Sequence, residues 1–191
     1  MNSSEFIAKA KELCAKKTMY IQTALGAPLT KANKLRLASS TPFNSQRSKK
    51  IFDASEDTIA FDEIGFISYI SGVKFKDYGQ LMSQCVDISK DLSTVVPGEI
   101  VFMRDRAGIF IGDGKVVTVS LEGVGITTIE GWISHGKLAY VEYVDPEVEE
   151  VVAEEAVVEA EPDDLASVEE EADVKPERNV DIRHDNRGRR H

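Results

Sequence analysis

The spacing of apolar residues changes once along this chain, near Glu99, and that change limits the folds open to it. Before Glu99 they recur every three or four positions, as Phe6, Ala10 and Leu13 do, which is typical of helices. After Glu99 they form short runs rich in β-branched and aromatic residues, which are typical of strands. We expect strands over residues 100–103, 107–111, 115–120, 124–129 and 138–144. Helices followed by an antiparallel meander predict an α+β domain, with the N-terminal helices packed on one side of an antiparallel sheet.

Turn and capping residues set the limits of several elements. Ser3 or Ser4 is expected to cap the first helix, and Gly112-Asp113-Gly114 is a tight hairpin signal between two of the predicted strands. Helices are predicted over residues 5–16, 31–36, 49–54, 63–71 and 77–88. The rest of residues 17–60 reads as irregular polar loop, with Ser39 to Asn44 as one clear loop.

The stretch 61–70 organises the N-terminal half. Asp62 is a good helix N-cap because its carboxylate can accept a hydrogen bond from a backbone N–H of the first turn. Glu63 then lies near the positive end of the helix dipole, and Gly72 is expected to end the helix. Many enzymes place a nucleophile at such a helix start, where the dipole lowers the pKa of a thiol. Here the position carries a carboxylate.

The formal net charge of −10 is unevenly spread. Residues 1–144 hold 17 Lys and Arg against 16 Asp and Glu, whereas residues 145–176 hold 14 acids and one lysine. We expect a folded domain over 1–144 and a disordered acidic linker over 145–176, which cannot bury enough apolar surface to offset its ordering entropy. Residues 177–191 form a basic C-terminal segment, and the spacing of His184 and His191 does not predict a metal site.

A basic run and two cysteines could suggest a functional site, but a structural role explains each of them more simply. The basic run Lys31, Lys34 and Arg36 is not interleaved with aromatic residues, so we expect a solvated face and no nucleic-acid partner. Cys14 and Cys85 each share a face with apolar residues and are expected in the core. Two cysteines in a chain of this length are not a disulfide framework, so a reduced cytoplasm is permitted. The first residues lack the features of a secretory signal and no apolar run could span a bilayer, so we expect a soluble protein with no membrane partner.

Several segments of the chain, taken in order, resemble a known family. The run Phe61-Asp62-Glu63-Ile64-Gly65-Phe66 resembles the Phe-Asp-Cys-x-Gly-hydrophobic segment of the NlpC-type papain-like cell-wall peptidases. Further segments are similar to the phage-endolysin branch of that family, at residues 17–21, 26–34, 97–114 and 132–140. The resemblance covers about residues 5–144 and implies a papain-like fold.

The resemblance also implies where the active site of such a peptidase would lie. The family's nucleophilic cysteine corresponds to Glu63, its histidine to Arg106, and its orienting polar residue to Thr118, with Asp62 lining the cleft. A carboxylate is a poor acyl-transfer nucleophile and a guanidinium cannot act as a base, so we expect no catalytic residue, cofactor or metal. If Glu63 and Arg106 face each other, we expect an ion pair that seals the old site.

Two other features could be offered as sources of catalytic activity. His135 falls in a closing Trp-x-x-His-Gly segment, which the resemblance makes structural, so a surface or core histidine is expected. Asp62 and Glu63 could be offered as an acid/base pair for glycosidic cleavage, but adjacent residues at a helix start point in different directions.

These observations favour a catalytically inactive NlpC-type homologue that acts as a binding or structural module. We expect a phage-encoded protein of the infected cytoplasm or the virion, with virion partners held through the C-terminal tail and a peptidoglycan stem peptide as a possible ligand. An active peptidoglycan hydrolase with unfamiliar residues and a host-directed interaction protein, such as an inhibitor, stay open as alternatives.

Overall fold

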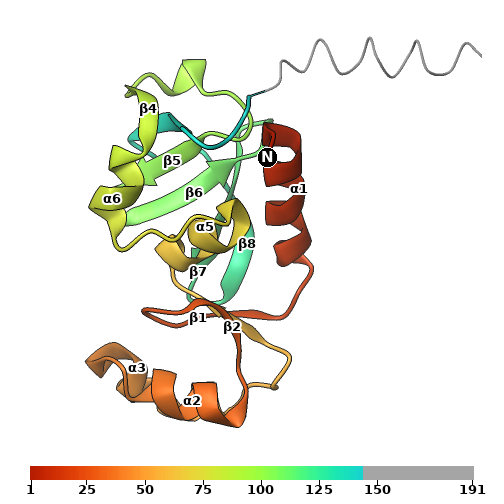
Figure 1. Ribbon diagram of the computed structural model, residues 1–191, viewed down its shortest axis with the longest axis vertical. Helices are drawn as coiled ribbons and strands as arrows, with labels where there is room; N and C mark the ends of the chain where they lie inside the picture. Colours follow the sequence, from red (N-terminus) through yellow and green to blue (C-terminus); the bar gives the residue numbers. More distant parts are fainter. Residues whose placement is uncertain (144–191) are drawn as a thin grey trace, which may run out of the picture. The chain divides into compact units, whose positions relative to one another are not determined.

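The computed structural model describes residues 1–143, so the expected acidic linker and basic C-terminal segment lie outside the described residues. Figure 1 shows helices packed beside a strongly twisted sheet, and the α+β class is confirmed. The helices are α1 (Ser3–Cys14), α2 (Lys31–Ala38), α3 (Pro42–Gln46), α4 (Ser48–Asp53), α5 (Glu63–Ser71), α6 (Tyr78–Ser83) and the 3-10 helix η1 (Leu92–Thr94). The strands are β1 (Thr18–Tyr20), β2 (Leu25–Pro28), β3 (Ile59–Phe61), β4 (Cys85–Ser89), β5 (Ile100–Met103), β6 (Arg106–Phe110), β7 (Lys115–Ser120), β8 (Gly123–Thr128) and β9 (Ser134–Leu138).

The larger sheet is antiparallel throughout, in the order β4-β9-β5-β6-β7-β8. The predicted strands 100–103 and 115–120 are confirmed, and those at 107–111 and 124–129 begin one residue earlier than expected. The strand predicted at 138–144 is wrong, because β9 ends at Leu138. Strand β9 begins with the polar sequence Ser134-His135-Gly136, which does not predict a strand. Pairing with β5 on one side and β4 on the other holds it extended.

Helix α5 forms over the predicted residues. The Asp62 carboxylate accepts a hydrogen bond from the Gly65 backbone N–H (2.6 Å), and Gly72 ends the helix with a φ of 72°. At the first helix the cap differs from expectation: Asn2 and Glu5 form a reciprocal capping box, and Ser3 already lies inside α1.

The helix predicted over residues 77–88 is wrong in its second half. Asp77 caps α6, which ends at Ser83, and the chain then enters β4. Residues 85–89 carry an apolar stripe that fits a helix, but in the fold they pair with the edge of β9, with Cys85 opposite Leu138. Tertiary pairing therefore overrides local propensity here.

Residues 17–60, expected to be mostly irregular, contain a second sheet and three short helices. Strand β3 lies between β1, to which it is parallel, and β2, to which it is antiparallel. The loop expected at 39–44 is interrupted by α3, which Thr41 caps. Lys34, expected on a solvated face, is only 8% exposed, and its Nζ donates to the carbonyl oxygens of Phe52 (3.1 Å) and Ala54 near the end of α4.

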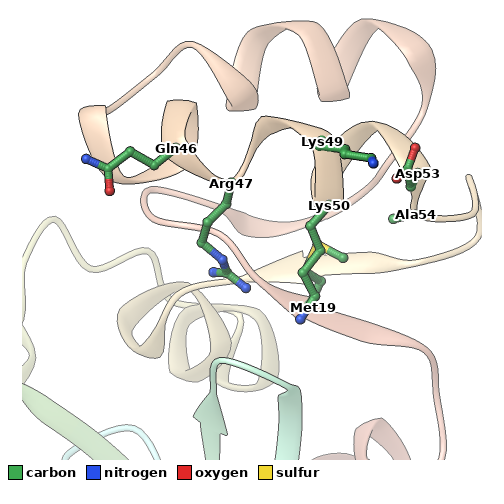
Figure 2. A pocket seen from close by; sticks show the side chains of 7 residues that line it. All are labelled: Met19, Gln46, Arg47, Lys49, Lys50, Asp53 and Ala54. Carbon is green, nitrogen blue, oxygen red and sulfur yellow. The ribbon is translucent and has the colours of Figure 1, made fainter.

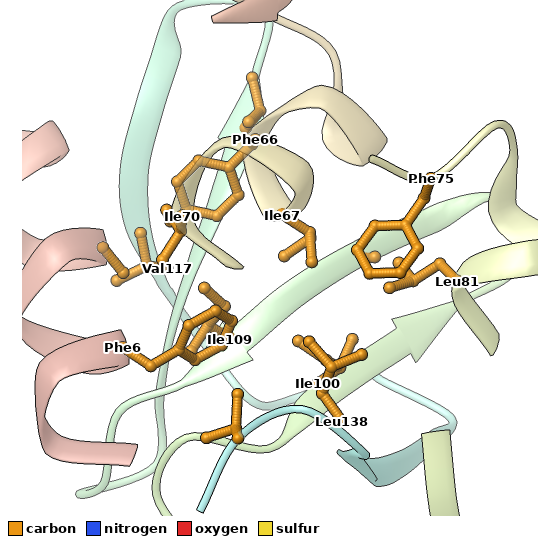
Figure 3. Close-up of a cluster of buried hydrophobic side chains, with 14 of the residues drawn as sticks. Phe6, Phe66, Ile67, Ile70, Phe75, Leu81, Ile100, Ile109, Val117 and Leu138 are labelled. Atoms are coloured by element: carbon orange, nitrogen blue, oxygen red, sulfur yellow. The ribbon is translucent and has the colours of Figure 1, made fainter. Parts of the chain in front are cut away.

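The largest buried cluster lies between the helices and one face of the six-stranded sheet. Phe6 of α1, Phe66 of α5 and Ile109 of β6 converge there (Figure 3). A smaller cluster around Leu37 and Ile51 supports α2 and α4, and a third lies on the other face of the sheet around the only tryptophan, Trp132. None of the helices in residues 1–143 is long and apolar enough to cross a membrane.

Candidate functional site

A cleft of about 520 Å³ opens where α5 and β6 begin. It is lined by Tyr20, Phe43, Glu63, Arg106, Val119, Ser120, Leu121 and Glu122. Glu63 is the first residue of α5, and Arg106 is the first residue of β6. The fold therefore brings together the two positions that the resemblance assigns to the nucleophile and the base, although they are 43 positions apart in sequence.

The Glu63 carboxyl is half-buried, and burial raises its pKa. The charges of Asp62 and Asp105 act in the same direction, while the Arg106 guanidinium opposes them. On the same wall, burial together with the negative charges of Glu63 and Asp62 raises the pKa of Tyr20 to about 12. The phenol thus stays protonated at neutral pH.

The expected ion pair between Glu63 and Arg106 is not formed. The ion pairs within residues 1–143 do not include these two side chains. Arg106 instead donates from Nη2 to the backbone carbonyl oxygen of Val119, at 3.4 Å. Because the guanidinium is held along β7, it lowers the Glu63 pKa only through space, and the cleft stays open between the two charges.

The other two predicted site residues face the protein backbone. Thr118 is buried in β7 opposite Gly108, and its hydroxyl donates to the carbonyl oxygen of Ala107 at 2.9 Å. Asp62 accepts hydrogen bonds from the backbone N–H groups of Gly65 and Thr23. Neither is among the residues that line the cleft.

No thiol or imidazole in residues 1–143 lines this cleft. Both cysteines are free. Cys85 is buried, as expected, and its burial raises the thiol pKa to about 12, whereas Cys14 is only half-buried, with its Sγ 3.7 Å from the Ala10 carbonyl oxygen. His135 is also buried. Its Nδ1 is hydrogen-bonded to the Glu99 carboxyl group, and its Nε2 lies 2.9 Å from the Asp91 carbonyl oxygen. Within the described part of the chain, no group of three or more His, Cys, Asp or Glu side chains could hold a metal ion.

One arginine that sequence reasoning passed over joins three walls of the cleft. The Arg47 guanidinium donates to the carbonyl oxygens of Tyr20 (3.0 Å) and Leu121 (3.2 Å), and it lies 5.2 Å from the centre of the Phe43 ring. The rings of Tyr20 and Phe43 meet edge to face with their centres 5.8 Å apart. Tyr20, Phe43 and Arg47 fall in the segment 17–60 that the sequence predicts to be mostly loop, and long loops inside a compact domain are often binding elements.

The cleft brings charged, polar and aromatic side chains together. It offers two carboxylates, a guanidinium, a phenol and a phenyl ring around one opening. A thiol and an imidazole that can take its proton, which a papain-like mechanism needs, are both lacking from this lining.

Solved structures similar to this chain include two NlpC/p60 domain proteins. No protein-family model and no curated protein matches the sequence. RipD from Mycobacterium tuberculosis, described as a non-catalytic NlpC/p60 domain protein adapted to peptidoglycan binding, is 15% identical with a TM-score of 0.49, over 71% of this chain and 96% of its own. The p60 domain of an antigen from M. avium paratuberculosis is 12% identical with a TM-score of 0.46, over 71% of this chain and 91% of its own.

Proposed function

We propose that this chain is an NlpC-type domain without peptidase activity, which acts as a binding or structural module. The observation that carries the proposal is the joint placement of Glu63 and Arg106 at the mouth of one cleft, at the start of α5 and of β6. These are the positions that the resemblance gives to the nucleophile and its base.

The chemistry of the two side chains supports the loss of hydrolysis. A carboxylate transfers acyl groups poorly, and an arginine stays protonated, so it cannot accept the proton that a nucleophile must lose. Removing one member of a catalytic group costs about 10⁶-fold in rate in a well-studied protease. With both positions changed, hydrolysis by the papain-like route is expected to be undetectable.

The ligand we propose for the cleft is a peptidoglycan stem peptide, which carries carboxylates and amines on a short chain. Arg106 can present its guanidinium to a carboxylate, and Glu63 can present its carboxylate to an ammonium group. Because these two side chains do not pair with each other, neither must be freed from an internal ion pair before a ligand binds.

One preparation of the full chain tests binding and hydrolysis together. We expect saturable binding of a purified muropeptide in calorimetry and no new peptide product by mass spectrometry after prolonged incubation. Glu63→Ala should weaken binding, whereas Glu130→Ala, at an exposed position outside the cleft, should leave it unchanged. Cleavage of the muropeptide that Glu63→Ala abolishes would show an active hydrolase with unfamiliar residues and would overturn the proposal.

We further propose that the protein is phage-encoded and associated with the virion, with residues 145–191 as its tether. The endolysin-like segments and the charged tail in the sequence support this. Mass spectrometry of purified particles should find this chain, and its absence would remove the virion role. Capture of a single host protein by the full chain, without muropeptide binding, would instead favour the host-directed role.

A further inference from the structure

A basic groove lies beside the cleft and is independent of the proposed peptidoglycan role. It consists of two adjoining cavities of about 640 and 470 Å³, which share Met19, Lys50 and Ala54 in their linings. Figure 2 shows the first cavity, where Arg47 and Lys50 project from the start of α4 toward β1, which carries Met19. The second cavity continues along the end of α1 and the turn after β7.

Positive charge dominates this groove. Five cationic side chains line the two cavities, against the two acids Asp53 and Glu122. The five cations are Lys16, Lys17, Arg47, Lys49 and Lys50. In a concave surface such charges add to one another, and together they attract an anionic partner.

The lysines are available for a ligand. Lys50 lies 3.7 Å from Glu122, Lys17 lies 3.0 Å from Asp57 and Lys16 lies 2.6 Å from Glu12, but all six side chains are at least 43% exposed. Exposed ion pairs contribute little, so an incoming carboxylate can replace these partners at small cost. Lys49 makes no ion pair or hydrogen bond within residues 1–143.

The lining between the charges is aliphatic. Met19 and Ala54 contribute to both cavities, and Leu121 and Val124 extend the apolar surface in the second. No aromatic side chain lines either cavity, so the groove lacks the stacking surface that single-stranded nucleic acids use. A suitable ligand therefore carries closely spaced negative charges together with small aliphatic groups.

We propose that the basic groove binds an acidic peptide in which glutamate or aspartate residues are interspersed with valine or alanine. The carboxylates pair with the groove lysines, and the aliphatic side chains cover Met19 and Ala54. A peptide with the sequence of residues 147–161 is a suitable probe, because seven of its 15 residues are glutamate and the other eight are valine or alanine.

The test measures binding of this labelled probe to the full chain by fluorescence anisotropy. The chain carries glutamine or asparagine in place of the 14 acidic residues of 145–176, so that the probe is the only acidic peptide of this kind present. We expect saturable binding that weakens with added salt, and no binding of a probe in which glutamine replaces every glutamate.

Matched charge reversals decide whether the groove is the site. The double variant Lys49→Glu/Lys50→Glu should weaken binding by roughly tenfold or more, because two attractive contacts become repulsive. Lys74→Glu/Lys76→Glu makes the same charge change at two exposed positions outside the groove, and should alter binding less than about twofold, as expected for distant surface charges under screening. Equal weakening by the two double variants, or no saturable binding of the acidic probe, would overturn the proposal.

Discussion

At the scale of single residues, the fold takes two polar side chains out of solvent and gives them specific partners. Lys34 lies buried beneath α4, and His135 lies buried beside Glu99. Sequence alone could place Glu63 at a helix start. It could not show that burial raises the Glu63 pKa by more than the Arg106 guanidinium lowers it.

The raised pKa of Glu63 gives a pH-dependent prediction. Since the folded state binds a proton more readily than the unfolded state, stability must fall as pH rises from the ordinary value of 4.5 through the raised folded value. Glu63→Gln removes this loss. We expect the variant to unfold at a higher temperature than the parent at pH 7, with the difference closing below pH 4.5.

Thermal melts of both proteins across this pH range provide the measurement. Glu130→Gln serves as the control, because it changes the same charge at an exposed position. If the gap between Glu63→Gln and the parent instead widened toward acid pH, the burial effect described for Glu63 would be wrong.

The buried pair of Glu99 and His135 gives a second residue-scale prediction. Both ring nitrogens have acceptors within reach, the Glu99 carboxylate and the Asp91 carbonyl oxygen. His135→Ala leaves a buried carboxylate without its partner, which should lower the free energy of unfolding by about 3 kcal/mol. Urea denaturation measures this loss. Lys137→Ala, on the same strand but partly exposed, should cost less than about 1 kcal/mol.

At the scale of elements, helix α5 approaches the second sheet so closely that one residue must be glycine. A Cβ built on Gly65 would lie 2.0 Å from the carbonyl oxygen of Ala24, just before β2. Backbone cannot move aside as a flexible side chain would, so this contact fixes where α5 begins relative to the strand and hence where Glu63 enters the cleft.

Two glycine-to-alanine variants should therefore change stability in opposite directions. Gly65→Ala should destabilise the protein by about 3 kcal/mol through overpacking, although alanine is the better helix former. Gly79→Ala, in α6, has only a side-chain oxygen at 3.4 Å and should be neutral or stabilising by about 0.5 kcal/mol. Urea midpoints of the two variants make the comparison, and a stable Gly65→Ala protein would contradict the close approach.

At the scale of the whole folded region, strand β3 connects the buried clusters. Phe61 packs in the large cluster beneath the six-stranded sheet, while the preceding residue, Ala60, packs in the small cluster with α2 and α4. Since one strand serves both, neither cluster can lose β3 without disturbing the other, and we expect residues 1–143 to unfold in one cooperative step.

Two optical probes test this cooperativity. Trp132 fluorescence reports the third cluster, and far-UV circular dichroism reports the helices, so their urea midpoints should coincide. Phe61→Ala should lower both midpoints together, with a loss of about 4 kcal/mol. A dichroism transition that precedes the fluorescence transition would show that the α2–α4 region unfolds separately.

The sequence by itself determined the α+β class, the extent of α5 with its Asp62 and Gly72 caps, and the hairpin at Gly112–Gly114, because each depends on local periodicity or on turn chemistry. Only the tertiary structure decided that residues 85–89 form a strand and that β9 is extended, because their neighbours supply the hydrogen bonds. It also decided the lining of the cleft and of the basic groove. Both are formed by side chains from segments far apart in the chain, and no local pattern records which of these segments meet.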